Sequence, residues 1–326
     1  ITLSYIKESG RGFNVNNLRC SLSKTELPMF EFEKIDLHVH TTVSDGTDSP
    51  ETISTLVKAE GISLFSVTDH DAVKGSAMVR AALSDDAPEF IPGAEFSCKD
   101  ENGKYHILGY GYDPDSEGIL KLVEMGHSYR MKKVRGRLEF LKQEFGFDFP
   151  EAKIEEMMGL DNPGKPHIGN LMVSCGYAET KEQAIKEYIN KIRFPGEYVR
   201  PEEAIEGILS GGGVPVLAHP SFGDGDQLII GDDMDQRLRR LMEFGLQGVE
   251  AFYSGFTEKL RNEMLFFADK YSLFVTAGSD YHGLNKLVWL GDTGLGKPSE
   301  WPEDLRCPEK ILKSCLRNAT QPAFSP

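Results

Sequence analysis

The sequence lacks features that mark several common classes of protein. Its 326 residues include only five cysteines, which are scattered and form no CxxC pair. An odd, scattered count fits a reduced, cytoplasmic protein better than a disulfide framework, and we expect that location. No apolar run approaches the length needed to cross a bilayer, so we expect no membrane contact.

Basic residues are also in short supply. The chain holds 36 Lys and Arg against 51 Asp and Glu, which gives a formal net charge of −15. Proteins that grip long nucleic acids draw on clustered Lys and Arg, so this balance argues against that function. It does not exclude a small anionic substrate, because bound metal ions can reverse the local field.

What the sequence does contain is a repeating order of strands and helices. In residues 35–40 ("IDLHVH") apolar and polar residues alternate, which is typical of a strand. Ser49, Pro50 and Glu51 then have the types favoured at a helix start. Further strands are predicted at 62–70, 90–96, 105–112, 214–219, 247–252 and 273–280. The alternation predicts an α/β fold with a parallel sheet or barrel.

Two segments break this order. Residues 116–195 carry helical patterns without a convincing strand, and we expect a helical insertion domain there. The barrel itself is then expected to comprise residues 30–115 and 196–326. Residues 1–29 show little periodicity and are expected to be an N-terminal extension, either disordered or foreign to the natural protein.

Ionisable side chains gather at or near the predicted strands. Taken singly, an HxH pair can be a solvated strand edge, and a lone strand histidine such as His106 is more often a satisfied core residue. Their joint recurrence changes this, because a parallel barrel brings its strand ends to one rim, where catalytic groups collect. The residues are His38, His40, Asp69, His70, Glu95, His106, His219, Asp280 and His282. Together they predict a polynuclear metal site.

The types of ligand limit the metal. Imidazole and carboxylate without thiolate suit Zn, Mn or Fe at a site other than a structural zinc site. We therefore expect two to three divalent ions as cofactors. Neighbouring ions of this kind generate hydroxide at neutral pH and hold the attacking and leaving oxygens of a phosphoester hydrolysis.

Six motifs resemble a known family in their order and spacing. They are "DLHVHTTVSDGT", "SVTDHD", "PGAEFS", "HILGYG", "LAHPS" and "GSDYHG". They resemble the PHP (polymerase and histidinol phosphatase) superfamily, most closely the branch that includes the 3′,5′-nucleoside bisphosphate phosphatases. The resemblance implies a distorted (β/α)₇ barrel with a small helical insertion domain and a trinuclear metal centre.

The resemblance also implies a ligand set for each ion. The implied ligands are His38, His40, Glu95 and Asp280 for one ion, Glu95, His106 and His219 for a second, and Asp45, His70 and His282 for the third. Some relatives have a histidine where Asp45 stands, and the aspartate matches the nucleotide phosphatases better.

The insertion is expected to supply the residues that contact the substrate. By resemblance, Arg130, Arg135 and His167 would contact substrate phosphate, and His167 would protonate the leaving group; Asp280 and His167 are the expected catalytic residues. For the two arginines, a solvated helix face remains the alternative. Lys165 stands where relatives often have arginine, and a lysine offers a point charge instead of a bidentate fork. Tyr198 could line the pocket or merely pack.

The resulting hypothesis is a metal-dependent phosphoesterase that hydrolyses a phosphomonoester of a small nucleotide, such as a 3′,5′-bisphosphonucleoside, with metal-activated hydroxide. The first alternative is a 5′→3′ exonuclease on short RNA or DNA. Histidinol-phosphate phosphatase, an amidohydrolase and a non-catalytic scaffold are further alternatives. The expected partner is a small phosphorylated substrate, and short oligonucleotides are the alternative. No obligate protein partner is expected.

Overall fold

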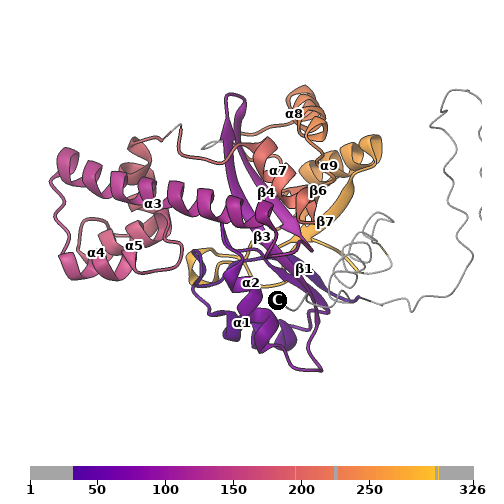
Figure 1. Ribbon diagram of the computed structural model, residues 1–326, viewed down its shortest axis with the longest axis horizontal. Helices are drawn as coiled ribbons and strands as arrows, with labels where there is room; N and C mark the ends of the chain where they lie inside the picture. The colour runs from indigo at the N-terminus through magenta and orange to yellow at the C-terminus, as the bar shows by residue number, and fades with distance from the viewer. Residues whose placement is uncertain (1–31, 195, 224–226, 298–299, 301–326) are drawn as a thin grey trace, which may run out of the picture. The chain divides into compact units, whose positions relative to one another are not determined.

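The computed structural model describes residues 32–194, 196–223, 227–297 and 300, and the extension predicted at 1–29 lies outside them. A seven-stranded sheet in the order β1 to β7 forms the centre of the described part (Figure 1). The strands are β1 (Ile35–Val39), β2 (Leu64–Val67), β3 (Glu89–Asp100), β4 (Gly103–Tyr110), β5 (Val214–Leu217), β6 (Gly248–Tyr253) and β7 (Phe274–Gly278). Neighbouring strands run parallel, except that β4 is antiparallel to both β3 and β5.

The two outer strands of this order, β1 and β7, meet through the segment that follows β7. The amide of Asp280 donates to the His38 carbonyl at 2.8 Å, and the amide of His40 donates to the Tyr281 carbonyl at 2.9 Å. The sheet therefore nearly closes on itself, which confirms the predicted distorted barrel.

The hairpin of β3 and β4 differs from the two short strands predicted at 90–96 and 105–112. Asp100 pairs with Gly103, so both strands extend to a turn only two residues long. Such a connection can join only antiparallel neighbours. Because Ser97 pairs with His106, and Glu95 lies two residues before Ser97, Glu95 and His106 share one face of the hairpin.

Helices cover the outside of the barrel. They are α1 (Pro50–Ala59), α2 (Lys74–Ala82), α7 (Pro201–Ser210), α8 (Gly231–Glu243) and α9 (Glu258–Tyr271). The predicted helix start at Ser49 is confirmed, because the Ser49 side chain accepts from the Thr52 amide at 3.2 Å.

Between β4 and α7 the described residues form helices only: α3 (Glu117–Phe145), α4 (Glu151–Met158), α5 (Lys165–Ser174), α6 (Lys181–Gln183), η1 (Ala184–Tyr188) and η2 (Ile189–Lys191). They share a hydrophobic cluster of their own that includes Val134, Leu141 and Ile168. The first half of α3 packs on the barrel: a Cβ at Gly126 would lie 2.7 Å from Asp71 Cβ. Domain boundaries at 116 and 195 stay a prediction.

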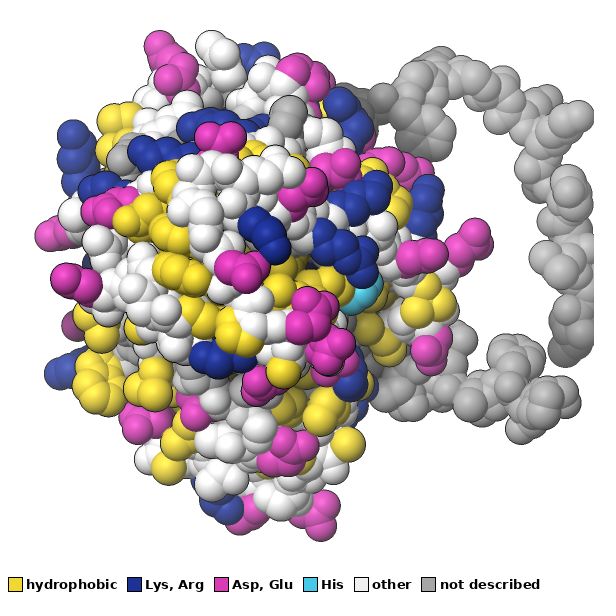
Figure 2. All heavy atoms as spheres, turned by 90° about the vertical axis from the view of Figure 1, so that its left-hand side faces the viewer, with side chains coloured by type: hydrophobic (Ala, Val, Ile, Leu, Met, Phe, Trp, Pro, Cys, Tyr) yellow, Lys and Arg dark blue, Asp and Glu magenta, His cyan; other side chains and the backbone are white. Residues whose placement is uncertain are grey.

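None of the helices in the described part combines the length and the apolar character that crossing a membrane requires. On the face that carries the helices between β4 and α7, acidic and basic side chains are interspersed, and no broad basic stripe crosses it (Figure 2).

Candidate metal centre

Strand β1 and the residue that follows it place two histidines in the centre of the site. His38 and His40 are fully buried, and their Nε2 atoms lie 3.2 Å apart. Residues at i and i+2 of a strand point to the same face, so this approach follows directly from the HxH spacing.

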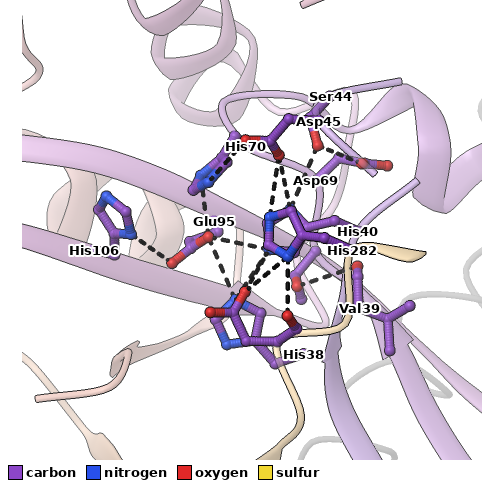
Figure 3. A network of polar contacts seen from close by, with 12 residues as sticks. His38, Val39, His40, Ser44, Asp45, Asp69, His70, Glu95, His106 and His282 are labelled. Carbon is purple, nitrogen blue, oxygen red and sulfur yellow. Dashed lines mark hydrogen bonds and ion pairs between the residues drawn. The ribbon is translucent and has the colours of Figure 1, made fainter. Parts of the chain in front are cut away.

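Glu95 on β3 lies in the middle of the histidines (Figure 3). Its Oε1 lies 2.8 Å from His106 Nδ1 and 3.1 Å from His219 Nε2. Its Oε2 lies 3.3 Å from Nε2 of both His38 and His40. One buried carboxylate thus touches imidazoles from three strands or strand ends, which suits a bridging ligand.

Asp280 follows β7 and turns one carboxylate oxygen toward the same histidines. Its Oδ1 lies 3.4 Å from His38 Nε2 and 3.3 Å from His40 Nε2. Its Oδ2 accepts hydrogen bonds from the Tyr253 hydroxyl at 3.0 Å and the Lys286 ammonium at 2.5 Å. These outer partners leave Oδ1 to face the cluster.

Asp45 lies on the far side of His40. Its Oδ1 is 3.2 Å from His282 Nε2, and its Oδ2 is 3.9 Å from His70 Nε2. The turn that carries Asp45 is held by Asp69, whose carboxylate accepts from Thr41 and Ser44. Asp69 therefore supports the turn rather than facing the cluster.

The structure thus brings together all nine residues that the resemblance implies as metal ligands. Candidate ligand atoms within 4.8 Å of one another form three groups: His38, His40, Glu95 and Asp280; His40, Asp45, His70 and His282; and His70, Glu95 and His106. His219, though outside these groups, lies 3.2 Å from His106 and 3.1 Å from Glu95. The division of the ligands among individual ions stays a prediction.

The chemistry of the donors fits divalent cations. Three buried atoms of this cluster, Asp45 Oδ1, His70 Nδ1 and Glu95 Oε2, have no well-oriented hydrogen bond, although buried polar atoms are normally satisfied. His70 Nδ1 lies 3.0 Å from Glu95 Oε2, and Asp45 Oδ1 lies 3.2 Å from His282 Nε2, so cations between these donors would satisfy them. Burial favours the neutral acids, but the surrounding histidines outweigh it and hold the pKa of Asp45 and Glu95 well below the usual values.

The histidines divide into two kinds. Burial lowers the pKa of His106 to about 4, so its imidazole is neutral and ready to bind metal. Burial also acts on His40, but hydrogen bonds and charges from Asp280 and Glu95 outweigh it and raise its pKa to about 9. A metal binding here would therefore displace a proton from His40.

A cavity of about 250 Å³ opens beside the cluster. Its walls come from the barrel and from the helices between β4 and α7, and several lining side chains are cationic. The cationic residues are Lys104, Arg130, Lys133, Arg137 and Lys165, and Tyr198 lines the cavity as well. Asp45, His70 and His106 form its floor. An anion in this cavity would meet the predicted metals on one side and cations on the other.

Arg130, a predicted substrate contact, lines this cavity and is anchored to the barrel. Its Nε and Nη2 donate to Asp71 Oδ2 at 3.2 and 2.9 Å, and a Cβ at Gly164 would lie 2.9 Å from its Nη1. Burial opposes the charge, but Asp71 and Asp45 raise the pKa of Arg130. Its guanidinium is therefore a fixed, charged group at the cavity.

The prediction for Arg135 needs correction. Arg135 is exposed and is not among the cavity-lining residues, so the solvated-face alternative describes it. Lys133 and Arg137, which the sequence did not single out, are buried at the cavity instead. The signal for them is helical spacing: Arg130, Lys133 and Arg137 recur at intervals of three and four residues and share one face of α3, whereas Arg135 does not.

The ring of His167 is held at the start of α5. The Gly164 amide donates to His167 Nδ1 at 3.0 Å, so the ring proton is on Nε2. Burial lowers the pKa of His167, which favours the neutral ring. A neutral imidazole held in this way can donate a hydrogen bond through Nε2. His167 is not among the residues that line the cavity, so its contact with phosphate and its role as general acid stay predictions.

One buried acid close to the cluster escaped the sequence analysis. Glu250 on β6 is fully buried, and its Oε1 lies 3.0 Å from His38 Nδ1. The segment "QGVEAF" was recognised as a strand, but a single acid within an apolar strand gives no signal of its own.

Comparisons with known proteins agree with this geometry. The PHP domain family matches residues 36–194. The 3′,5′-nucleoside bisphosphate phosphatase of Chromobacterium violaceum is 28% identical over 261 residues, which cover 76% of this chain and 87% of that protein. A 5′-3′ exoribonuclease of Haemophilus influenzae is 25% identical, with 77% and 90% covered. A phosphoribosyl 1,2-cyclic phosphate 1,2-diphosphodiesterase of Eggerthella lenta is 29% identical, with 76% and 94% covered.

Solved structures show the same architecture. A protein from Bifidobacterium adolescentis, described as a metal-dependent phosphoesterase, aligns with a TM-score of 0.72 at 26% identity and covers 86% of this chain and 96% of that one. A protein from Chromobacterium violaceum, described as an amidohydrolase with bound sulfate, aligns with a TM-score of 0.73 at 22% identity over the same shares of the two chains. The second likeness speaks for the fold alone.

Proposed function

Because the chain belongs to the PHP family of phosphoesterases, we propose that it removes one phosphate from a small nucleotide that carries a second phosphate, such as a 3′,5′-bisphosphonucleoside. The observation that carries this proposal is the two-sided cavity. Its floor is the cluster of His, Asp and Glu side chains, and its wall is formed by the cations of α3, β4 and α5. A substrate with two anionic groups can use both sides.

The size of the cavity supports a small substrate. A volume of about 250 Å³ lies just below the usual range for ligand pockets, which begins at about 300 Å³. The cations lie within the cavity, and the face in Figure 2 has no basic stripe along which a long strand could bind. The same reasoning favours a mononucleotide over an oligonucleotide.

The predicted ligands would hold two to three divalent ions, Mn, Fe or Zn. When bound, such ions supply a hydroxide nucleophile at neutral pH and neutralise charge on the reacting phosphate. Arg130, fixed by Asp71, would bind and orient the phosphate through its remaining N–H groups. His167 would donate its Nε2 proton in a hydrogen bond to a phosphate oxygen, and the proton for the leaving oxygen would come from water in the cavity.

Relatives named as exoribonucleases keep a second function open, namely 5′→3′ removal of nucleotides from short RNA. An assay with Mn²⁺ can separate the two, using adenosine 3′,5′-bisphosphate, adenosine 5′-monophosphate and a 5′-phosphorylated trinucleotide. Because a charge-assisted hydrogen bond is worth about 1.5–3 kcal/mol, we expect kcat/KM for the bisphosphate to exceed that for the monophosphate by about tenfold or more. A higher kcat/KM for the trinucleotide would overturn the proposal in favour of the exonuclease.

A further inference from the structure

Glu250 lies beneath the predicted metal cluster, on the side away from the cavity. It belongs to β6, its side chain is completely inaccessible, and it is not among the residues that line the cavity. Among the described residues, its hydrogen-bond partners are the His38 ring and the His219 backbone amide, and no Lys or Arg forms an ion pair with it. A buried acid with such partners needs an explanation, since burying a carboxylate is costly.

Both oxygens of Glu250 accept hydrogen bonds. Oε2 accepts from the His219 amide at 2.7 Å, and Oε1 lies 3.0 Å from His38 Nδ1. A carboxylate has no proton to give, so the proton of this second hydrogen bond is on His38 Nδ1. The other ring nitrogen, Nε2, is then the atom left to bind a metal ion, and it lies 3.3 Å from Glu95 Oε2 and 3.4 Å from Asp280 Oδ1.

The packing around Glu250 and His38 leaves these side chains little room to move. They fit only because residue 278 on β7 is glycine: a Cβ there would lie 2.3 Å from both Glu250 Oε1 and His38 Cβ. Glu250 Oε2 accepts from the amide of His219. This residue has a positive φ of 28°, which costs energy in any residue other than glycine. The one carboxylate therefore restrains two predicted ligands, the ring of His38 and the backbone of His219.

We propose that Glu250 is a positioning residue of the metal centre: it selects the His38 tautomer that binds metal through Nε2 and holds His219 in its strained backbone conformation. This inference rests on the proposed function, because it presupposes that the cluster binds divalent ions. Carboxylates that orient metal-bound histidines in this way typically affect metal affinity 10- to 100-fold.

The test is the apparent Kd for Zn²⁺ and Mn²⁺ in wild type and Glu250→Gln, measured by competition with a chromophoric chelator. Gln can accept from only one side. If it accepts from His219, its amide donates to His38 Nδ1 and moves the ring proton to Nε2, which blocks the ligand atom. If it accepts from His38, its NH₂ group faces the His219 N–H, and two donors cannot form a hydrogen bond with each other. We expect affinity for at least one ion to fall by about 10- to 100-fold.

Asp100→Asn is the matched control, since it also replaces a buried carboxylate by an amide. The Asp100 side chain is inaccessible and pairs with Arg240 at the tip of the β3–β4 hairpin, away from the cluster. We expect this variant to lose stability but to keep the metal affinity of wild type. In a His38→Ala background, most of the effect of Glu250→Gln should disappear.

The outcomes separate the two proposals. Wild-type affinity in Glu250→Gln, or a loss no larger than in Asp100→Asn, would overturn the role of Glu250 and leave the proposed function standing. A full loss that persists without the His38 ring would overturn the selection of the His38 tautomer. A wild-type protein that binds neither ion would overturn both. If Glu250→Gln does not fold, Glu250→Asp decides, because it keeps the charge but shortens the reach; its metal affinity should fall, and an unchanged value overturns the inference.

Discussion

The two sides of the cavity are built differently. The barrel side presents acids and imidazoles such as Glu95 and Asp280, each held by neighbours on other strands. The α3 side presents long cations, among them Lys133 and Arg137, which are only 8% and 6% exposed. Among the described residues no carboxylate forms an ion pair with either cation, and their neighbours are aromatic rings: Lys133 Nζ lies 3.7 Å from the Tyr198 ring centroid, and the Arg137 guanidinium carbon lies 5.2 Å from that of Phe194. Burying cations without an anionic partner is unfavourable, so an anion in the cavity would stabilise the α3 side. The comparison suggests that the barrel side is set for metal and the α3 side for substrate.

The largest expected effect belongs to the barrel side. Asp280→Asn removes the charge that faces His38 and His40, and loss of a metal ligand costs several kcal/mol of transition-state stabilisation, so we expect kcat to fall by about a thousandfold. Metal content, measured on the same preparation, should fall as well. Asp235→Asn, on α8 where the carboxylate pairs with Lys270, is the control and should keep the activity and metal content of wild type. Full activity in Asp280→Asn would remove the barrel side from the mechanism.

The next effect tests which residues of α3 belong to the cavity. Arg137→Met removes a cavity-lining cation, whereas Arg135→Met, two residues away on the same helix, removes an exposed one. We expect kcat/KM for a bisphosphorylated nucleotide to fall by about tenfold in the first variant and to stay within about twofold of wild type in the second. Arg137 is a cleaner probe than Arg130, because replacing Arg130 also leaves Asp71 without its partner. Equal losses in both variants would contradict the assignment of the α3 face.

The smallest effect is a pH dependence on the α3 side. Burial lowers the pKa of Lys133 to about 7, although the nearby Asp71 opposes this change. Lys133 is charged below this pH and loses its charge above it, so the affinity for inorganic phosphate should fall as the pH rises through about 7. The measurement is the competitive inhibition constant of phosphate from pH 6 to 9. Lys133→Arg keeps its charge over this range and serves as the reference for the ionisation of phosphate itself. The same pH dependence in both proteins would exclude Lys133 as its source.

The difference between the two sides of the cavity also explains which parts of the site could be predicted from the sequence. His38 and His40 are two residues apart on a strand, and Asp280 and His282 follow the last strand, so their convergence follows from strand geometry and barrel closure. The barrel was therefore predictable together with the side chains that meet at its rim. The face that α3 turns to the cavity depends on how a helix packs on the barrel. Arg130 and Arg135 looked equivalent in the sequence, and the contact of Gly126 with Asp71 is part of what distinguishes them.

Sequence alone determined the fold class and the residues that meet at the rim, because short-range spacing and the parallel arrangement of strands leave those side chains few other places. Only the tertiary structure decided the parts that depend on a partner distant in the chain. It placed Glu250 beneath His38, showed that the Gly164 amide sets the tautomer of His167, and assigned Lys133 and Arg137 instead of Arg135 to the cavity. A hydrogen bond to a carboxylate 212 residues away leaves no trace in local pattern, because its energy comes from geometry that exists only after folding.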